Sequence, residues 1–129
     1  MYDETEVRSL LIDSCHSSKD AQAYFDSRLS DPDLLDVLMT IATDTEDHGG
    51  DAPMQAAYYA SKFSGLLLAP YEQLLITLLP HVNGFAGHVA LALGKTRSTE
   101  GRDLILQALG DGSRYDAWLF HNALAEYER

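Results

Sequence analysis

Apolar residues recur along this chain at the spacing of α-helices, in groups that short polar segments separate. The separating segments are rich in serine, glycine and proline, as in Ser30-Asp31-Pro32, Ala69-Pro70 and Gly110-Asp111-Gly112. The alternating pattern of β-strands is scarce, and leucine and alanine dominate. The pattern predicts an all-α protein of about eight helices. Their expected positions are residues 3–16, 19–29, 32–43, 53–67, 71–79, 85–94, 99–109 and 114–127.

Capping residues support several of these boundaries. Asp31 followed by Pro32 predicts a helix start, because an aspartate side chain accepts hydrogen bonds from free backbone N–H groups and proline suits the first helical position. Ser98 stands in the same way before the helix 99–109. Gly94 is typical of a residue that ends a helix, and we interpret it as the C-terminal cap of the helix 85–94.

Three of the expected helices carry the same apolar stripe, with positions i, i+1, i+4 and i+5 filled. The stripes are Leu34, Leu35, Leu38 and Met39; Leu74, Leu75, Leu78 and Leu79; and Leu104, Ile105, Ala108 and Leu109. The second helices also correspond: Phe85, Val89, Ala92 and Leu93 match Tyr115, Leu119, Ala123 and Leu124. This repetition predicts three helix pairs, at residues 32–67, 71–94 and 99–127.

Stacking of these pairs in order would bury the stripes that one pair alone leaves exposed. We therefore expect a single domain over residues 1–129, with residues 1–30 as an N-terminal helical cap and residues 31–129 as the helix pairs. In the cap, Val7, Leu10 and Leu11 should face the array. Among the pairs, deep burial is expected for Leu75, Leu78, Val89, Leu104, Leu109 and Leu119.

The spacing resembles the short HEAT-like repeats of the bilin-lyase type. The likeness is clearest in the segment Gly87-His-Val-Ala-Leu-Ala-Leu-Gly94, followed by Glu100-Gly-Arg-Asp-Leu-Ile-Leu-Gln-Ala-Leu109, and it extends roughly over residues 32–127. The resemblance implies a helical-repeat fold. It does not imply any particular activity, because such repeats occur in scaffolds, lyases, inhibitors and DNA glycosylases. The proline or aspartate expected inside each first helix is largely missing, so an irregular helical bundle is the alternative fold.

The composition narrows the possible partners. Nine basic residues against twenty acidic ones give a formal net charge of −11, which argues against binding to nucleic acid or to anionic lipid. A single cysteine, Cys15, excludes an internal disulfide and a cysteine-rich zinc site. The acidic start Met-Tyr-Asp-Glu-Thr-Glu is not a secretory signal, and a cytoplasmic protein is expected.

The acidic residues concentrate in the first half of the chain. Residues 1–60 hold thirteen acidic and three basic residues, a net charge of −10, whereas residues 61–129 carry a net charge of −1. A negative field on one side attracts a positive partner and speeds its association. The loop between Thr43 and Ala52 adds acidic residues and also interrupts the repeat spacing.

Candidate catalytic and metal sites each have a simpler structural interpretation. Gly94-Lys95-Thr96 lacks the first glycine of a phosphate-binding loop, since position 89 is valine. Adjacent residues such as Cys15 and His16 point in different directions on a helix. His81 and His88 do not share a helical face, and the acidic loop lacks the ligand spacing of a calcium loop. We predict no catalytic residue, no cofactor and no bound metal.

The sequence therefore predicts a non-catalytic module that binds a basic protein. The expected partner-binding residues are Asp33, Asp36, Asp44, Glu46, Asp47, His48, Asp51 and Tyr58. In size and charge the chain resembles bacterial immunity proteins, which implies an inhibitor that neutralises a basic toxin or nuclease. One alternative is a HEAT-like scaffold or regulatory subunit. Another is a bilin-lyase-like enzyme, with a pocket walled by Tyr58, Tyr59, Phe63 and Trp118.

Overall fold

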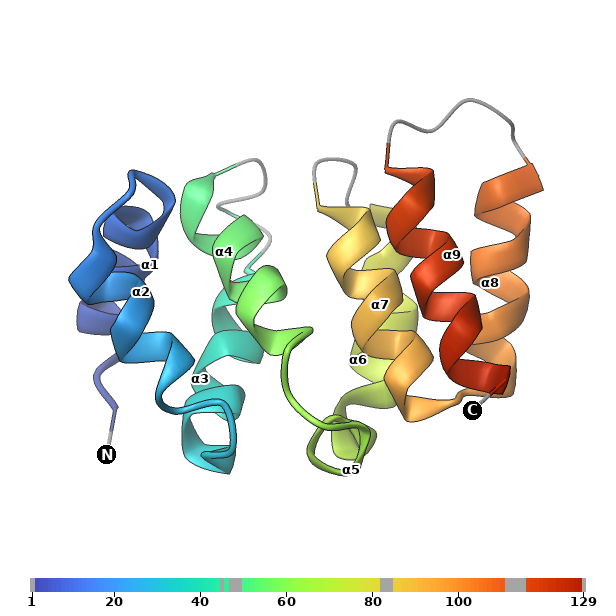
Figure 1. Ribbon diagram of the computed structural model, residues 1–129, viewed down its shortest axis with the longest axis horizontal. Helices are drawn as coiled ribbons and strands as arrows, with labels where there is room; N and C mark the ends of the chain where they lie inside the picture. The colour runs from blue at the N-terminus through green and yellow to red at the C-terminus, as the bar shows by residue number, and fades with distance from the viewer. Residues whose placement is uncertain (1, 45, 47–49, 82–84, 111–115, 129) are drawn as a thin grey trace. The chain divides into compact units, whose positions relative to one another are not determined.

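The computed structural model describes residues 2–44, 46, 50–81, 85–110 and 116–128 (Figure 1). The described residues form helices and connecting turns, with no strand among them, which confirms the all-α prediction. Contacts divide the chain into two compact units, unit 1 (Met1–Phe63) and unit 2 (Ser64–Arg129). Each unit has its own apolar core.

The described residues of unit 1 form four α-helices, α1 (Glu4–Cys15), α2 (Lys19–Asp26), α3 (Pro32–Ala42) and α4 (Asp51–Ala60). The packing of α3 against α4 is the most extensive contact of this unit, and α1 packs against α2, α3 and α4. The core side chains that become fully buried include Leu11, Phe25, Leu34, Leu38, Ile41 and Phe63. Helix α1 is thus part of the core of unit 1, and Val7 and Leu11 are buried as expected, whereas Leu10 is half-buried.

Short polar side chains fix the starts of α1, α2 and α3 in unit 1. The Asp3 carboxylate accepts hydrogen bonds from the backbone N–H groups of Thr5 and Glu6 at the start of α1. Asp31 does the same for Asp33, with Pro32 at the first helical position, which confirms the predicted start of α3. These caps satisfy backbone donors that have no partner within the helix.

The prediction of one helix over residues 53–67 is wrong, because the helix is interrupted between α4 and α5 (Gly65–Leu68). Helix α4 ends at Ala60, and Ser64 begins the next helix by accepting a hydrogen bond from the Leu67 N–H group. Phe63 between them is fully buried. A serine followed by glycine is the local signal of this second start.

Unit 2 begins with α5, a short 3-10 helix η2 (Ala69–Tyr71) and α6 (Glu72–Leu78), which continues into η3 (Leu79–His81). Helices α7 (Ala86–Thr96), α8 (Thr99–Gly110) and α9 (Ala117–Ala125) follow, with a final turn η4 (Glu126–Glu128). The packing of α7 against α9 is the most extensive contact of this unit (Figure 1). Helix α6 contacts both α7 and α8.

The packing of unit 2 agrees with most of the expected core. Leu75, Leu78, Val89 and Leu119 are buried as predicted. Leu104 and Leu109 are only half-buried, so their expected deep burial is wrong, and Ile105 is the residue of α8 that becomes fully buried. The apolar stripe of α8 is two residues wide, and the neighbouring helices bury only part of that width.

The interpretation of Gly94 as a C-terminal cap is also wrong. Helix α7 runs on to Thr96, and Arg97 ends it in the left-handed conformation, with φ of 58°. Gly94 lies inside the helix, where it allows close packing against α9. Ser98, by contrast, caps α8 as predicted, because its hydroxyl oxygen accepts a hydrogen bond from the Gly101 N–H group.

Candidate functional site

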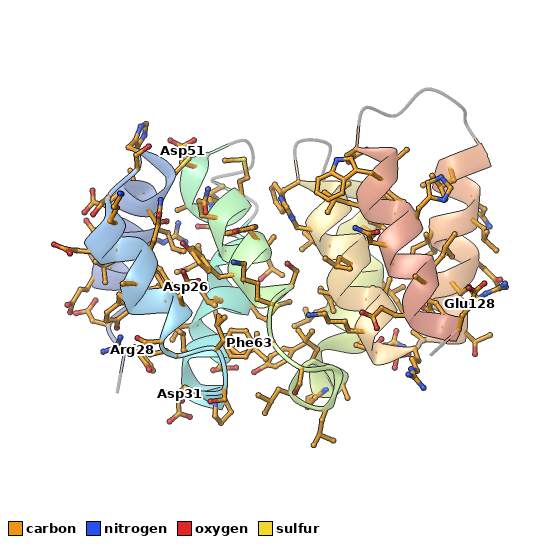
Figure 2. The ribbon with its side chains drawn as sticks, in the orientation of Figure 1. Asp26, Arg28, Asp31, Asp51, Phe63 and Glu128 are labelled. Atoms are coloured by element: carbon orange, nitrogen blue, oxygen red, sulfur yellow. The ribbon has the colours of Figure 1, made fainter. Side chains whose placement is uncertain are left out.

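The predicted partner-binding residues lie in three places on unit 1. Asp33 and Asp36 are exposed near the start of α3, whereas Asp44 and Glu46 follow its end and Asp51 begins α4. Asp31 and Asp51 mark the opposite ends of these helices in Figure 2. At a rise of about 1.5 Å per residue, the length of α3 keeps the two acidic groups roughly 15 Å apart. Tyr58 belongs to a third place, near the end of α4.

Asp33 and Asp36 line a surface cavity of about 400 Å³ together with Tyr2 and Val37. Beside it, the Tyr2 hydroxyl donates a hydrogen bond to an Asp31 carboxylate oxygen at 2.5 Å. This bond raises the pKa of Tyr2 to about 12 and lowers the pKa of Asp31. The N-terminal segment is therefore fixed against the start of α3, and it forms one wall of an acidic cavity.

At the other end of α3, two predicted residues are engaged within the unit. The Arg8 guanidinium donates to Asp44 at 2.6 Å, and Arg8 also lies 3.7 Å from Glu4. Asp51 pairs with the exposed His16 ring at 3.1 Å. These contacts join α1 to the ends of α3 and α4, so Asp44 and Asp51 contribute to the fold as well as to the surface charge.

Of the other residues predicted at this end of unit 1, the structure describes Glu46. Glu46 is exposed, and its backbone N–H group donates to the Asp44 carboxylate. Asp47 and His48 lie outside the described residues. The acidic loop is therefore described at its two ends, through Asp44, Glu46 and Asp51.

Tyr58 lines a polar hollow on unit 1, which we call the Tyr58 hollow. The hollow has a volume of about 290 Å³ and lies between α1, α2 and α4. Its lining residues are Ser14, Gln22, Asp26, Gln55, Tyr58 and Tyr59. As expected, Tyr59 is the buried member of the tyrosine pair, at 2 % exposure, and Tyr58 is more exposed.

A lysine that follows α4 lies at the edge of this hollow. The Lys62 ammonium is 4.6 Å from the centre of the Tyr58 ring and 5.8 Å from that of Tyr59. It is also 3.8 Å from the Asp26 carboxylate. A hydrogen bond with Tyr58 raises the pKa of Lys62, although burial opposes that shift. A positive charge thus already lies at the edge of the Tyr58 hollow, against the face of the Tyr58 ring.

Reasoning from the sequence missed Gln22, Asp26, Gln55 and Lys62. They come from separate helices, and only the packing of α2 against the rest of unit 1 brings Asp26 to Tyr58 and Lys62. The available signal was local: Gln55, Tyr58 and Lys62 are three and four residues apart, so they share one face of α4 and its extension.

Unit 2 contains a half-buried histidine, His88, close to a buried aspartate, Asp116. Burial lowers the pKa of His88 on α7, and the nearby Asp116 partly opposes this shift. Asp116 is itself buried. A neutral imidazole near a carboxylate is a combination that can transfer protons. Within the described residues, no group of three or more histidine, cysteine or acidic side chains is arranged to hold a metal ion.

No family model, curated protein or solved structure matches this chain. None of the helices in the described part of the chain has the length and apolar character needed to cross a membrane.

Proposed function

We propose that the chain is a non-catalytic protein-binding module whose unit 1 binds a basic protein. The observation that carries this proposal is the distribution of charge between the units. Unit 1 has thirteen acidic against four basic residues, a net charge of −9, whereas unit 2 has a net charge of −2. A field of this kind increases the local concentration of a positively charged partner.

The side chains of unit 1 favour this interpretation. Its acidic residues are largely exposed, including Asp13, Asp20, Asp33, Asp36 and Glu46. Three of its four basic residues are engaged in contacts within the unit. Arg8 pairs with Asp44, Arg28 lies over the Tyr24 ring at 3.9 Å, and Lys62 lies over the Tyr58 ring. The exposed surface of unit 1 is therefore more strongly dominated by negative charge than the numbers of acidic and basic residues indicate.

We further propose that the helices form HEAT-like pairs, α3 with α4, α6 with α7 and α8 with α9. Contacts within unit 2 support this arrangement, since the first helices α6 and α8 contact each other and so do the second helices α7 and α9. Stacked pairs of this kind present broad helical surfaces that suit protein partners. The proposed binding function depends on the acidic surface of unit 1, because the fold alone does not determine an activity.

The partner we favour is a basic toxin or nuclease that the chain neutralises, as immunity proteins do. An acidic surface that covers a positively charged active site would block its substrate and would associate quickly. The test begins with a photo-crosslinking residue in place of Glu46 on unit 1, or of Asp103 on unit 2, to identify the bound protein. Inhibition of the purified partner's activity by the chain then distinguishes an inhibitor from a scaffold.

Binding kinetics test the acidic surface itself. The triple variant D33N/D36N/E46Q removes three exposed charges from unit 1, and E100Q/D103N/E128Q removes three exposed charges from unit 2. We expect the first variant to slow association about tenfold and the second to change it little, because charges near an interface act mainly on association. Raising salt from about 0.1 M to 1 M should abolish the difference, since the Debye length falls from about 10 Å to about 3 Å. Equal effects of the two triple variants would contradict the proposal.

A further inference from the structure

We propose that the Tyr58 hollow receives an arginine side chain of the basic partner, and that Lys62, at the edge of the hollow, contacts Tyr58 and Asp26 in its place in the unbound chain. The inference rests on the proposed function and specifies which chemical group unit 1 recognises. It combines three observations: an aromatic face, a carboxylate beside that face, and a cation already held between them. A cationic group of the partner would replace the internal one.

The inner side of the hollow is a fixed aromatic surface. Tyr59 is buried, and its ring stacks on Phe25 with the ring centres 4.6 Å apart. Tyr58 meets Tyr59 edge to face, with the centres 4.9 Å apart. This packing holds the Tyr58 ring in place, so that its face is available to a cation without a loss of side-chain freedom on binding.

Lys62 shows that the site accepts a cation, and its ion pair with Asp26 there is weak. Its ammonium lies 3.8 Å from the Asp26 carboxylate, which is longer than a hydrogen bond, and 36 % of the Lys62 side chain and 53 % of that of Asp26 are exposed. Exposed ion pairs of this kind contribute little to stability. When Lys62 is displaced, it gives up this weak ion pair and its hydrogen bond with Tyr58, and its flexible stem allows the ammonium to turn into solvent.

An arginine side chain fits the same surroundings better than a lysine does. Its planar guanidinium can stack on the Tyr58 ring and donate two parallel hydrogen bonds to the Asp26 carboxylate. Gln22 donates its amide N–H to the Ser14 carbonyl oxygen, which leaves its amide oxygen as an acceptor. Gln55 supplies a second amide to the lining. A hollow of about 290 Å³ has room for the end of one long side chain.

The experiment uses the full chain and a short blocked peptide, acetyl-Gly-Arg-Gly-amide, with the citrulline peptide as the uncharged control. Binding is followed by NMR chemical shifts of the Gln22 and Gln55 side-chain amides and of Tyr58. We expect the arginine peptide to shift these signals with a millimolar dissociation constant, and the citrulline peptide to have little effect. Equal shifts from both peptides would overturn the proposal, because charge would then play no part in recognition.

Matched variants separate the hollow from the general field of unit 1. Lys62→Ala opens the site and Lys19→Ala removes the same charge from the start of α2; we expect only the first to tighten peptide binding beyond the general field effect, by about fivefold. Asp26→Asn removes the carboxylate, and its control is Asp20→Asn, which changes another exposed aspartate of the same helix. We expect Asp26→Asn to weaken binding about tenfold and Asp20→Asn to weaken it little.

Two further outcomes are decisive. If the members of each matched pair behave alike, or if neither the natural chain nor Lys62→Ala shows shifts at the hollow, the arginine site is wrong. The proposed function would survive that result, because it is tested separately by the association rate of the acidic triple variant. Unchanged chemical shifts in the cores of both units establish that each variant is folded.

Discussion

Gly94 of α7 lies directly against the backbone of Ala123 of α9. A Cβ atom built on Gly94 would be 2.6 Å from the Ala123 carbonyl oxygen, closer than real Cβ atoms approach such a group. The two helices of unit 2 can therefore approach each other only because residue 94 has no side chain. The same chain provides a control in Gly110, where an added Cβ meets nothing within 4 Å.

We expect Gly94→Ala to lower the free energy of unfolding by about 1–3 kcal/mol, because α7 and α9 must move apart or strain their backbones. Gly110→Ala should raise it by about 0.5 kcal/mol, since alanine favours the helix over glycine. Urea denaturation of both variants measures the difference. A Gly94→Ala variant as stable as the natural chain would contradict the close packing of α7 on α9.

The second prediction concerns the core of α8. Ile105 is fully buried, whereas its neighbour Leu104 is half-buried. We expect Ile105→Ala to cost about 2–5 kcal/mol through lost apolar burial and a residual cavity. Leu104→Ala should cost less than half of that amount, because part of its side chain already contacts water. Thermal or urea unfolding of the two variants measures both costs. A larger loss for Leu104→Ala than for Ile105→Ala would show that α8 turns Leu104, and not Ile105, toward the core.

The third prediction is a loss of stability at mildly acid pH that depends on His88. Burial lowers the pKa of His88 in the folded chain, whereas the unfolded chain retains an ordinary value near 6.5. As the pH falls below that value, the unfolded state binds a proton that the folded state resists, so the free energy of unfolding decreases. His88→Gln should flatten this dependence between about pH 7.5 and pH 5.5, a window set by the ordinary histidine pKa.

His121→Gln is the control for this experiment, because it changes an exposed imidazole on α9. Urea unfolding at several pH values gives the slope for each variant. If the slope were the same in the natural chain and in His88→Gln, burial of His88 would not govern the acid response.

The fourth prediction tests the link between the N-terminal segment and α3. The Tyr2 hydroxyl donates to Asp31, which raises the pKa of Tyr2 to about 12 and lowers that of Asp31. Tyr2→Phe should raise the pKa of Asp31 toward its ordinary value, although the backbone N–H groups of Asp33 and Leu34 still stabilise the carboxylate. NMR titration of the Asp31 carboxyl carbon measures the shift.

The sign of the linked stability change can also be checked. A carboxyl group with a lowered pKa in the folded chain stabilises the fold above its unfolded pKa, near 3.8, and this stabilisation is lost as the pH falls. Tyr2→Phe should therefore reduce the stability difference between neutral and acid pH. An Asp31 titration identical in both chains would show that the hydrogen bond does not form in solution.

Helix identity and several helix starts could be predicted from the sequence because their causes are local. Asp31 and Ser98 cap helices through atoms only two or three residues away. The stripe of α3 is buried as a whole, with Leu34, Leu35 and Leu38 in the core. Such features depend on helical periodicity alone.

The errors have causes that lie far apart in the sequence. Gly94 has the residue type of a helix cap, and only the position of Ala123 on α9 shows that it is a packing position. The break before Ser64 was hidden because the apolar pattern continues across it into Leu66 and Leu67. The Tyr58 hollow could not be predicted either, because Asp26, one of its lining residues, belongs to a different helix from Tyr58.

The concentration of acidic residues in unit 1 also affects the fold of that unit. Thirteen acidic side chains on one small unit repel one another, and this repulsion opposes the burial of its core. Added salt weakens the repulsion, just as it weakens attraction to a positive partner. Unit 1 should accordingly become more resistant to unfolding at the salt concentrations at which the proposed basic partner would be released. Its acidic surface would then exchange intrinsic stability for speed of capture at low ionic strength.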